Sequence, residues 1–193
     1  MTKTLSDITR VRRRFQRSIR LGDDVAAAAG FICTATAAQA LETTIEHVSA
    51  LRHGAFTWTG PYGCGKSSLA VVLAALLGPD GPARDEALKV MPEQLREQIL
   101  GKMGWEPAGW TTISVVGSRS DTSSVLTSAL DEAGIKKGRG PIERLVAEAK
   151  RGIGTLLVID EMGKLLEHAA SEGGDAFFFQ ELAEAASRSD GRL

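Results

Sequence analysis

Eight residues, GPYGCGKS at 60–67, restrict the possible fold more than any other part of the sequence. They fit the pattern G-x-x-x-x-G-K-[ST], in which glycines let the backbone curl until several N–H groups point inward at a phosphate. Lys66 would neutralise phosphate charge, and Ser67 would offer its hydroxyl to Mg²⁺. The pattern requires a strand before the loop and a helix after it, whose N-terminus completes the anion site. The predicted nucleotide-binding residues are Gly60, Pro61, Tyr62, Gly63, Cys64, Gly65, Lys66, Ser67 and Ser68.

The residues on either side of this loop have the required character. AFTWTG at 55–60 is rich in β-forming residues and predicts a buried strand. Residues 67–77 are almost entirely apolar, which predicts a helix that is buried on all sides and stops at residue 78. Upstream, apolar residues at helical spacing predict a helix that runs from Ala38 and closes at Gly54.

Two further apolar segments predict strands: TTISVVGS at 111–118 and GTLLVIDE at 154–161. The second is a continuous apolar run, as expected when both faces of a sheet are covered. Helical patterns lie between and after them, one capped by Asp121, one opening at Pro141 and one over about 175–187. Alternating strands and helices predict an α/β fold with a parallel sheet and right-handed crossovers.

An acidic pair, Asp160 and Glu161, ends the last apolar run. Ligands of open α/β sheets bind beyond the carboxyl ends of the strands, so we expect both acids to lie near the glycine loop. Asp160 would hold Mg²⁺ through its water shell, and Glu161 would orient and polarise the water that attacks a γ-phosphate. Lys66 and Glu161 are therefore the predicted catalytic residues, and Ser67 and Asp160 the predicted Mg²⁺ ligands. Taken alone, such an acidic pair is also compatible with a solvated turn.

The segments GPYGCGKS and LLVIDE resemble the Walker A and Walker B motifs of P-loop NTPases. The Asp-Glu pair resembles the branch with an additional catalytic glutamate, which includes AAA+ and STAND-like ATPases. The longer phrases AFTWTGPYGCGKSSLA and VIDEMGKLLEHAA look like the N-terminal part of large bacterial ATPases, some of them associated with anti-phage defence. The resemblance implies a three-layer αβα fold with a parallel sheet, ATP as substrate or ligand and Mg²⁺ as cofactor.

In that branch a further strand follows the Walker B helix and lies between the first and third strands. Here the last predicted helix runs into SRSDGRL at 187–193, so we expect the fold to be incomplete at its C-terminus. Each polar group left unpaired on a buried strand edge costs about 1–3 kcal/mol. Three arrangements would avoid that cost: the chain is the amino-terminal part of a longer protein, a second chain supplies the strand, or strands one and three pair directly. We expect the first.

The predicted division is a basic arm and lead-in at 1–37 and a P-loop core at 38–193, with a helical insertion at about 79–109. Residues 1–20 hold seven cations against one acid, which indicates a solvated helix or a contact with nucleic acid. The whole chain has a net charge of -1, which gives no case for an anionic membrane as partner. No apolar run approaches a bilayer's thickness and the charged start lacks a signal core, which predicts a cytoplasmic protein.

For some residues the sequence is compatible with two roles. Phe31 or Ile32 would stack on adenine or pack in the core, and Arg119 would reach a neighbouring subunit's phosphate or lie on the surface. Cys33 and Cys64 match no metal or redox spacing and are predicted to be free thiols.

Three functions fit these residues. The first is an ATPase that drives motion in a larger protein or assembly, with self-association or a protein partner expected. The second is a nucleotide-operated switch with little turnover. The third is a small-molecule kinase, which would need a lid bearing arginines, and the insertion offers only Arg84 and Arg96. The absence of an Asn/Thr-Lys-x-Asp guanine motif favours ATP over GTP.

Overall fold

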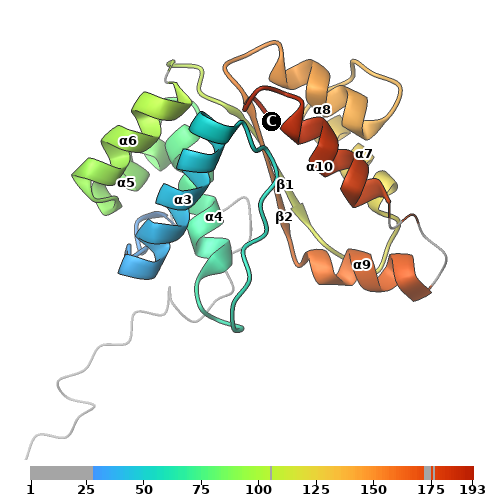
Figure 1. Cartoon of the computed structure of the whole chain (residues 1–193), viewed down its shortest axis with the longest axis horizontal. Helices are drawn as coiled ribbons and strands as arrows, with labels where there is room; N and C mark the ends of the chain where they lie inside the picture. Colours follow the sequence, from blue (N-terminus) through green and yellow to red (C-terminus); the bar gives the residue numbers. More distant parts are fainter. Residues whose placement is uncertain (1–27, 105, 172–174, 176) are drawn as a thin grey trace, which may run out of the picture.

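The computed structural model describes residues 28–104, 106–171, 175 and 177–193. The seven cations of the predicted basic arm lie outside these ranges. Within them the chain forms eight helices and a two-stranded parallel sheet, which confirms a mixed α/β fold (Figure 1). None of the helices in the described ranges is long and apolar enough to cross a membrane.

The sheet consists of β1 (Thr111–Val116) and β2 (Thr155–Asp160). The strands are parallel, with Thr111 opposite Thr155 and Val116 opposite Asp160. Both strands were predicted from their apolar runs, and each is two residues shorter than predicted. Beyond the last pair, the Gly117 N–H donates a 2.7 Å hydrogen bond to the carbonyl of Asp160, so the carboxyl ends of the strands stay together.

Four helices pack on one side of the strands and form the first lobe (Figure 1). They are α3 (Ala35–Leu51), α4 (Lys66–Leu77), α5 (Pro82–Val90) and α6 (Glu93–Met103). Eight residues of α4 are buried, as expected for a helix without a polar face. The insertion contains two helices, and α5 was not predicted. Helix α3 starts before Ala38 and ends at Leu51, because Arg52, rather than Gly54, adopts the left-handed cap conformation.

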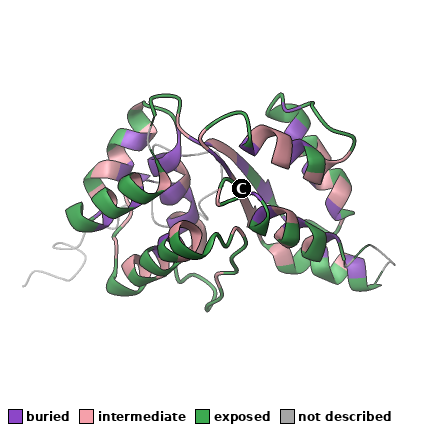
Figure 2. Cartoon of the chain, turned by 45° about the horizontal axis from the view of Figure 1, so that its top comes forward, coloured by how far each residue is buried: buried purple, intermediate pink, exposed green. Residues whose placement is uncertain are grey.

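Three helices form the second lobe, whose core also includes residues of β1. They are α7 (Thr122–Glu132), α8 (Pro141–Ala149) and α10 (Phe178–Ser187), and a further helix, α9 (Met162–Ser171), follows β2 directly. Asp121 caps α7 by accepting a 2.8 Å hydrogen bond from the Ser124 N–H, and Pro141 opens α8, both as predicted. Buried residues occur on the inward faces of the helices, most of all on α4, and at a few positions of the strands (Figure 2).

Residues 55–60, predicted as a buried strand, form no strand in the structure. Residues 55–57 are exposed, and the Trp58 Nε1–H donates a 3.3 Å hydrogen bond to Thr44 Oγ1 in the middle of α3. A strand requires a partner for its ladder of N–H and C=O groups, and none of the described residues supplies one here. The three-stranded sheet expected from the sequence is therefore reduced to two strands.

A cavity of about 500 Å³, the open-edge groove, separates residues 54–58 from β2. Its lining is mainly apolar and includes Phe56, Leu73, Leu157 and Leu182. The groove explains why β2, predicted to be fully covered, is only partly buried from Leu156 to Asp160. Direct pairing of 55–60 with β2, one of the three arrangements considered above, is not what these residues form.

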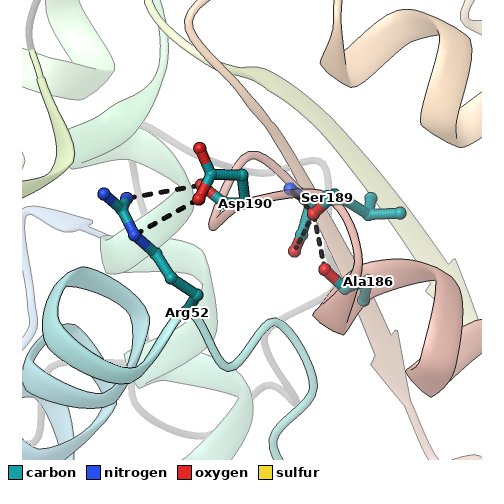
Figure 3. Close-up of polar contacts among 5 residues, drawn as sticks. Arg52, Ala186, Ser189 and Asp190 are labelled. Carbon is teal, nitrogen blue, oxygen red and sulfur yellow. Dashed lines mark hydrogen bonds and ion pairs between the residues drawn. The ribbon is translucent and has the colours of Figure 1, made fainter.

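The last residues of the chain lie at one end of this groove. Asp190 Oδ1 lies 3.3 Å from Arg52 Nε, and Ser189 Oγ donates a hydrogen bond to the carbonyl of Ala186 (Figure 3). The Arg52–Asp190 pair connects the turn after α10 with the residue that caps α3, and so connects the two lobes, while the Ser189 hydrogen bond holds that turn against the end of α10.

Candidate functional site

The loop before α4 has the curled backbone that its glycines predict. Gly63 has φ 78° and Gly65 has φ 90°, values that side chains with a Cβ rarely adopt. A Cβ at either glycine would meet nothing within 4 Å, so the backbone conformation, and not crowding, requires glycine here. Gly65 precedes α4 without a side-chain cap, so the first-turn N–H groups and the positive end of the helix face the loop.

Lys66 reaches back over the loop. Its Nζ donates hydrogen bonds of 3.0 Å to the carbonyls of both Gly60 and Pro61, and Cys64 Sγ lies 3.6 Å away. The ammonium group therefore binds two carbonyl oxygens of the same loop that is predicted to hold phosphate. A phosphate oxygen is a stronger partner than a neutral carbonyl, because both members of the pair are then charged.

Asp160 and Glu161 form a tight turn where β2 ends. The Glu161 N–H donates a 3.0 Å hydrogen bond to Asp160 Oδ1, and Glu161 has φ 55°, a left-handed conformation. A Cβ on Gly117 would lie 2.3 Å from the Glu161 carbonyl oxygen, so the turn rests directly on the β1 end. The Glu161 backbone is thereby fixed, and the position of its carboxylate depends on side-chain rotation alone.

The chemistry-bearing residues of the two segments line one cavity of about 340 Å³, the loop–strand cavity. Lys66 and Ser67 enter it from the start of α4, and Asp160 and Glu161 from the end of β2. Phe56 and Trp58 supply part of its apolar wall, and both also line the open-edge groove, so the two cavities are contiguous. The other predicted nucleotide-binding residues do not line this cavity: Gly60, Pro61, Tyr62, Gly63, Cys64, Gly65 and Ser68.

The donor set for a metal is small. No group of three or more His, Cys, Asp or Glu side chains within the described ranges is arranged to hold a metal ion. Ser67 and Asp160 instead offer one hydroxyl and one carboxylate on a shared cavity. This set fits Mg²⁺, which is usually held by one or two protein oxygens together with water and substrate phosphates.

Other candidate residues lie apart from this cavity. Phe31 packs against the core of the first lobe, as the packing alternative predicted, and Ile32 is 75 % exposed. Arg119 is exposed and lies 3.5 Å from Glu167, in the surface arrangement. Cys33 and Cys64 are free, as predicted.

Lys164 was not predicted and lies against the candidate base. Its Nζ is 2.8 Å from Glu161 Oε2, and its N–H donates a 3.0 Å hydrogen bond to the Glu161 carbonyl. The side-chain hydrogen bond to Glu161 raises the pKa of Lys164, with a smaller contribution from Glu167. The sequence signal is an acid three residues before a lysine, with the acid just ahead of the start of α9.

Comparisons of the chain with protein-family models, with curated proteins and with solved structures gave no match.

Proposed function

We propose that this chain binds ATP and hydrolyses it with the help of Mg²⁺, as a P-loop ATPase with an added catalytic glutamate. The observation that supports this most directly is the loop–strand cavity. It combines a lysine, a hydroxyl and two carboxylates from the two segments whose sequences predicted those roles. A three-layer P-loop core and the use of hydrolysis to move a larger protein or assembly belong to the same proposal.

The loop before α4 would bind the triphosphate when Lys66 exchanges its present hydrogen-bond partners for phosphate oxygens. Lys66 gives up the carbonyls of Gly60 and Pro61 for phosphate oxygens, while the loop N–H groups and the α4 N-terminus bind the same anion. Ser67 and Asp160 would hold Mg²⁺, which supplies neutralisation of the phosphate charge when bound. These groups all act through position and charge, which is what phosphoryl transfer requires of a protein.

Glu161 is the group placed to activate water. Its carboxylate accepts a proton as the water oxygen bonds to the γ-phosphorus, and the bond from that phosphorus to the bridging oxygen breaks, leaving ADP and inorganic phosphate. The base sits one residue beyond the Mg²⁺ ligand Asp160, so the turn described above sets the distance between the two roles.

A kinase function is disfavoured by the two arginines of the insertion. Arg84 is buried, donates a 3.0 Å hydrogen bond to the Gly78 carbonyl and pairs with Asp80. Arg96 donates a hydrogen bond to the Leu88 carbonyl. Both arginines therefore hold the insertion together, and neither extends as a lid arginine would.

The experiment compares wild type with Lys66→Ala and Glu161→Gln, measuring Mg-ATP affinity and steady-state phosphate release. We expect Lys66→Ala to weaken binding by about tenfold or more, because a charge-assisted contact is lost. We expect Glu161→Gln to keep binding and lower turnover by about 10²–10⁴-fold. The exposed residues Lys102 and Glu97 of α6 provide the controls Lys102→Ala and Glu97→Gln.

Other results of the same experiment would favour a different function. Tight binding with a slow rate that Glu161→Gln leaves unchanged would favour the nucleotide-operated switch. Transfer of the phosphate to a metabolite would favour the kinase. If neither substitution changes binding or turnover, the site assignment is wrong.

A further inference from the structure

Glu161 lies between two hollows of the surface. On one side is the loop–strand cavity, with Lys66 and Ser67. On the other is an open hollow of about 700 Å³, the α9 hollow, which Glu161 shares with Gly117, Ser118, Arg119, Gly163, Lys164 and Glu167. Lys164 lines the α9 hollow and does not line the loop–strand cavity. A Glu161 carboxylate bound to Lys164 therefore faces the α9 hollow.

The ion pair between Lys164 and Glu161 uses the same carboxylate that the proposed catalysis requires. The left-handed backbone at Glu161 rests on Gly117, so the main chain cannot follow the carboxylate to a new position. A carboxylate hydrogen-bonded to an ammonium at 2.8 Å also has one oxygen occupied, so that oxygen is not available to bind water. Both effects act against Glu161 as a base for water in the loop–strand cavity.

Every charged group around the α9 hollow takes part in an ion pair. Lys164 pairs with Glu161, and Arg119 pairs with Glu167 at 3.5 Å. Both pairs are exposed: the side chains of Lys164 and Glu161 are 50 % and 41 % exposed, and those of Arg119 and Glu167 are 78 % and 65 % exposed. Exposed pairs of this kind are weak and are screened by salt. The Lys164 pair can therefore bias the position of Glu161 without locking it.

We propose that Lys164 is a positioning residue that restrains Glu161 on the α9 side, so that the bound chain turns over slowly until the pair is broken. The proposal rests on the ATPase function proposed above. Lys164 does not line the loop–strand cavity, and its interaction with the glycine loop is electrostatic, through Tyr62, and weaker than its contact with Glu161. Its removal should therefore change turnover more than nucleotide affinity.

The test measures kcat, KM and nucleotide affinity for wild type, Lys164→Met and Lys164→Arg, with Lys102→Met as the control in an exposed helical lysine. At low salt we expect Lys164→Met to raise kcat about two- to fivefold, the range that an exposed ion pair supports. Lys164→Arg keeps the positive charge and should behave like wild type. Raising salt from about 0.01 M to 1 M shortens the Debye length from about 30 Å to about 3 Å, so the ratio of mutant to wild-type kcat should fall toward one.

The two proposals fail in different ways. If Glu161→Gln abolishes turnover while Lys164→Met equals wild type or is slower, the restraint is wrong and the ATPase proposal stands. A kcat ratio that does not change with salt also overturns the restraint, because a packing effect of the substitution would not be screened. If Glu161→Gln retains full turnover, or wild type and Lys164→Met both bind nucleotide without turnover, both proposals fall.

Discussion

The backbone N–H of Thr155 donates a 2.7 Å hydrogen bond to the carbonyl of Arg192, on the edge of β2 that faces away from β1. The Thr111 N–H donates a 3.0 Å hydrogen bond to the carbonyl of Gly154, so the C=O and N–H of the Gly154–Thr155 peptide bond pair with β1 on one side and with Arg192 on the other. The segment around Arg192 thus makes a strand-like contact at the start of β2. Farther along the same edge of β2, residues line the open-edge groove.

This contact depends on the close approach of two backbones at Gly54. A Cβ on Gly54 would lie 2.4 Å from the Leu193 carbonyl oxygen and 2.5 Å from that of Ala186. We therefore expect Gly54→Ala to lower the free energy of unfolding by about 1–3 kcal/mol through overpacking. Thermal or denaturant unfolding followed by circular dichroism measures the change.

The control for this substitution is Gly101→Ala. Gly101 lies within α6, and a Cβ there would meet nothing within 4 Å. Alanine in an exposed helix interior should stabilise the chain by about 0.5–1 kcal/mol relative to glycine. Equal changes for the two substitutions would show that the segment at Leu193 does not pack on Gly54.

The cap of α7 gives a prediction for pH dependence. Hydrogen bonds from the N–H and hydroxyl of Ser124 lower the pKa of Asp121. A lowered folded-state pKa means that the contribution to stability is present above the unfolded pKa, about 3.9, and is lost as the pH falls through the lower folded value. We expect Asp121→Ala to cost about 1 kcal/mol at neutral pH. The difference from wild type should shrink below about pH 4, where wild type loses its charged cap.

Asp121→Asn separates the cap from its charge, because asparagine accepts the same hydrogen bonds without titrating in this range. Its stability difference from Asp121→Ala should stay constant between neutral pH and acid, as followed by urea unfolding at each pH. A constant gap between wild type and Asp121→Ala across the same range would contradict the assignment of the cap to the ionised carboxylate.

The sequence correctly predicted the helices and strands that are determined by a few adjacent residues. The Asp121 cap, the Pro141 start of α8 and the apolar runs of β1 and β2 each depend on a few adjacent residues, and the structure has all of them. Residues 55–60 have equally good β-forming composition and still form no strand. A strand depends on a hydrogen-bonding partner far away in the sequence, and composition carries no information on whether that partner is present.

The burial of individual side chains likewise depends on contacts that the local sequence does not reveal. Phe177 and Phe178 are identical neighbours in sequence, but Phe177 is 72 % exposed and Phe178 is buried, because α10 begins between them and its phase decides which ring faces the core. For the candidate site, the rule that ligands bind beyond strand ends placed Asp160 near Lys66, and both line one cavity. Lys164 was missed because an acid–lysine spacing of three is common on solvated helices.

Arg144 is a charged residue of α8, yet it is buried. Its Nε donates a 2.7 Å hydrogen bond to the Ile135 carbonyl, and its Nη2 lies 2.6 Å from Asp131 Oδ1. Arg144→Met should lower the free energy of unfolding by about 1–3 kcal/mol, because the buried Ile135 carbonyl loses its partner. Arg151→Met removes a pair with Glu148 in which Arg151 is 69 % exposed, and should change stability by less than about 1 kcal/mol. Denaturant unfolding compares the two, and equal losses would contradict a structural role for the buried arginine.

Asp160 gives the last prediction, which concerns the metal. Its carboxylate and the Ser67 hydroxyl line one cavity, and Asp160→Asn keeps the shape of the side chain while removing its charge. Because a hard cation binds an anionic oxygen more strongly than an amide oxygen, we expect Asp160→Asn to raise the Mg²⁺ concentration for half-maximal phosphate release by about tenfold or more. Chelation of Mg²⁺ should abolish release by wild type. Asp85→Asn, on the exposed first turn of α5, is the control and should titrate like wild type. An unchanged Mg²⁺ requirement in Asp160→Asn would remove Asp160 from the metal site and leave Ser67 as the only predicted protein ligand.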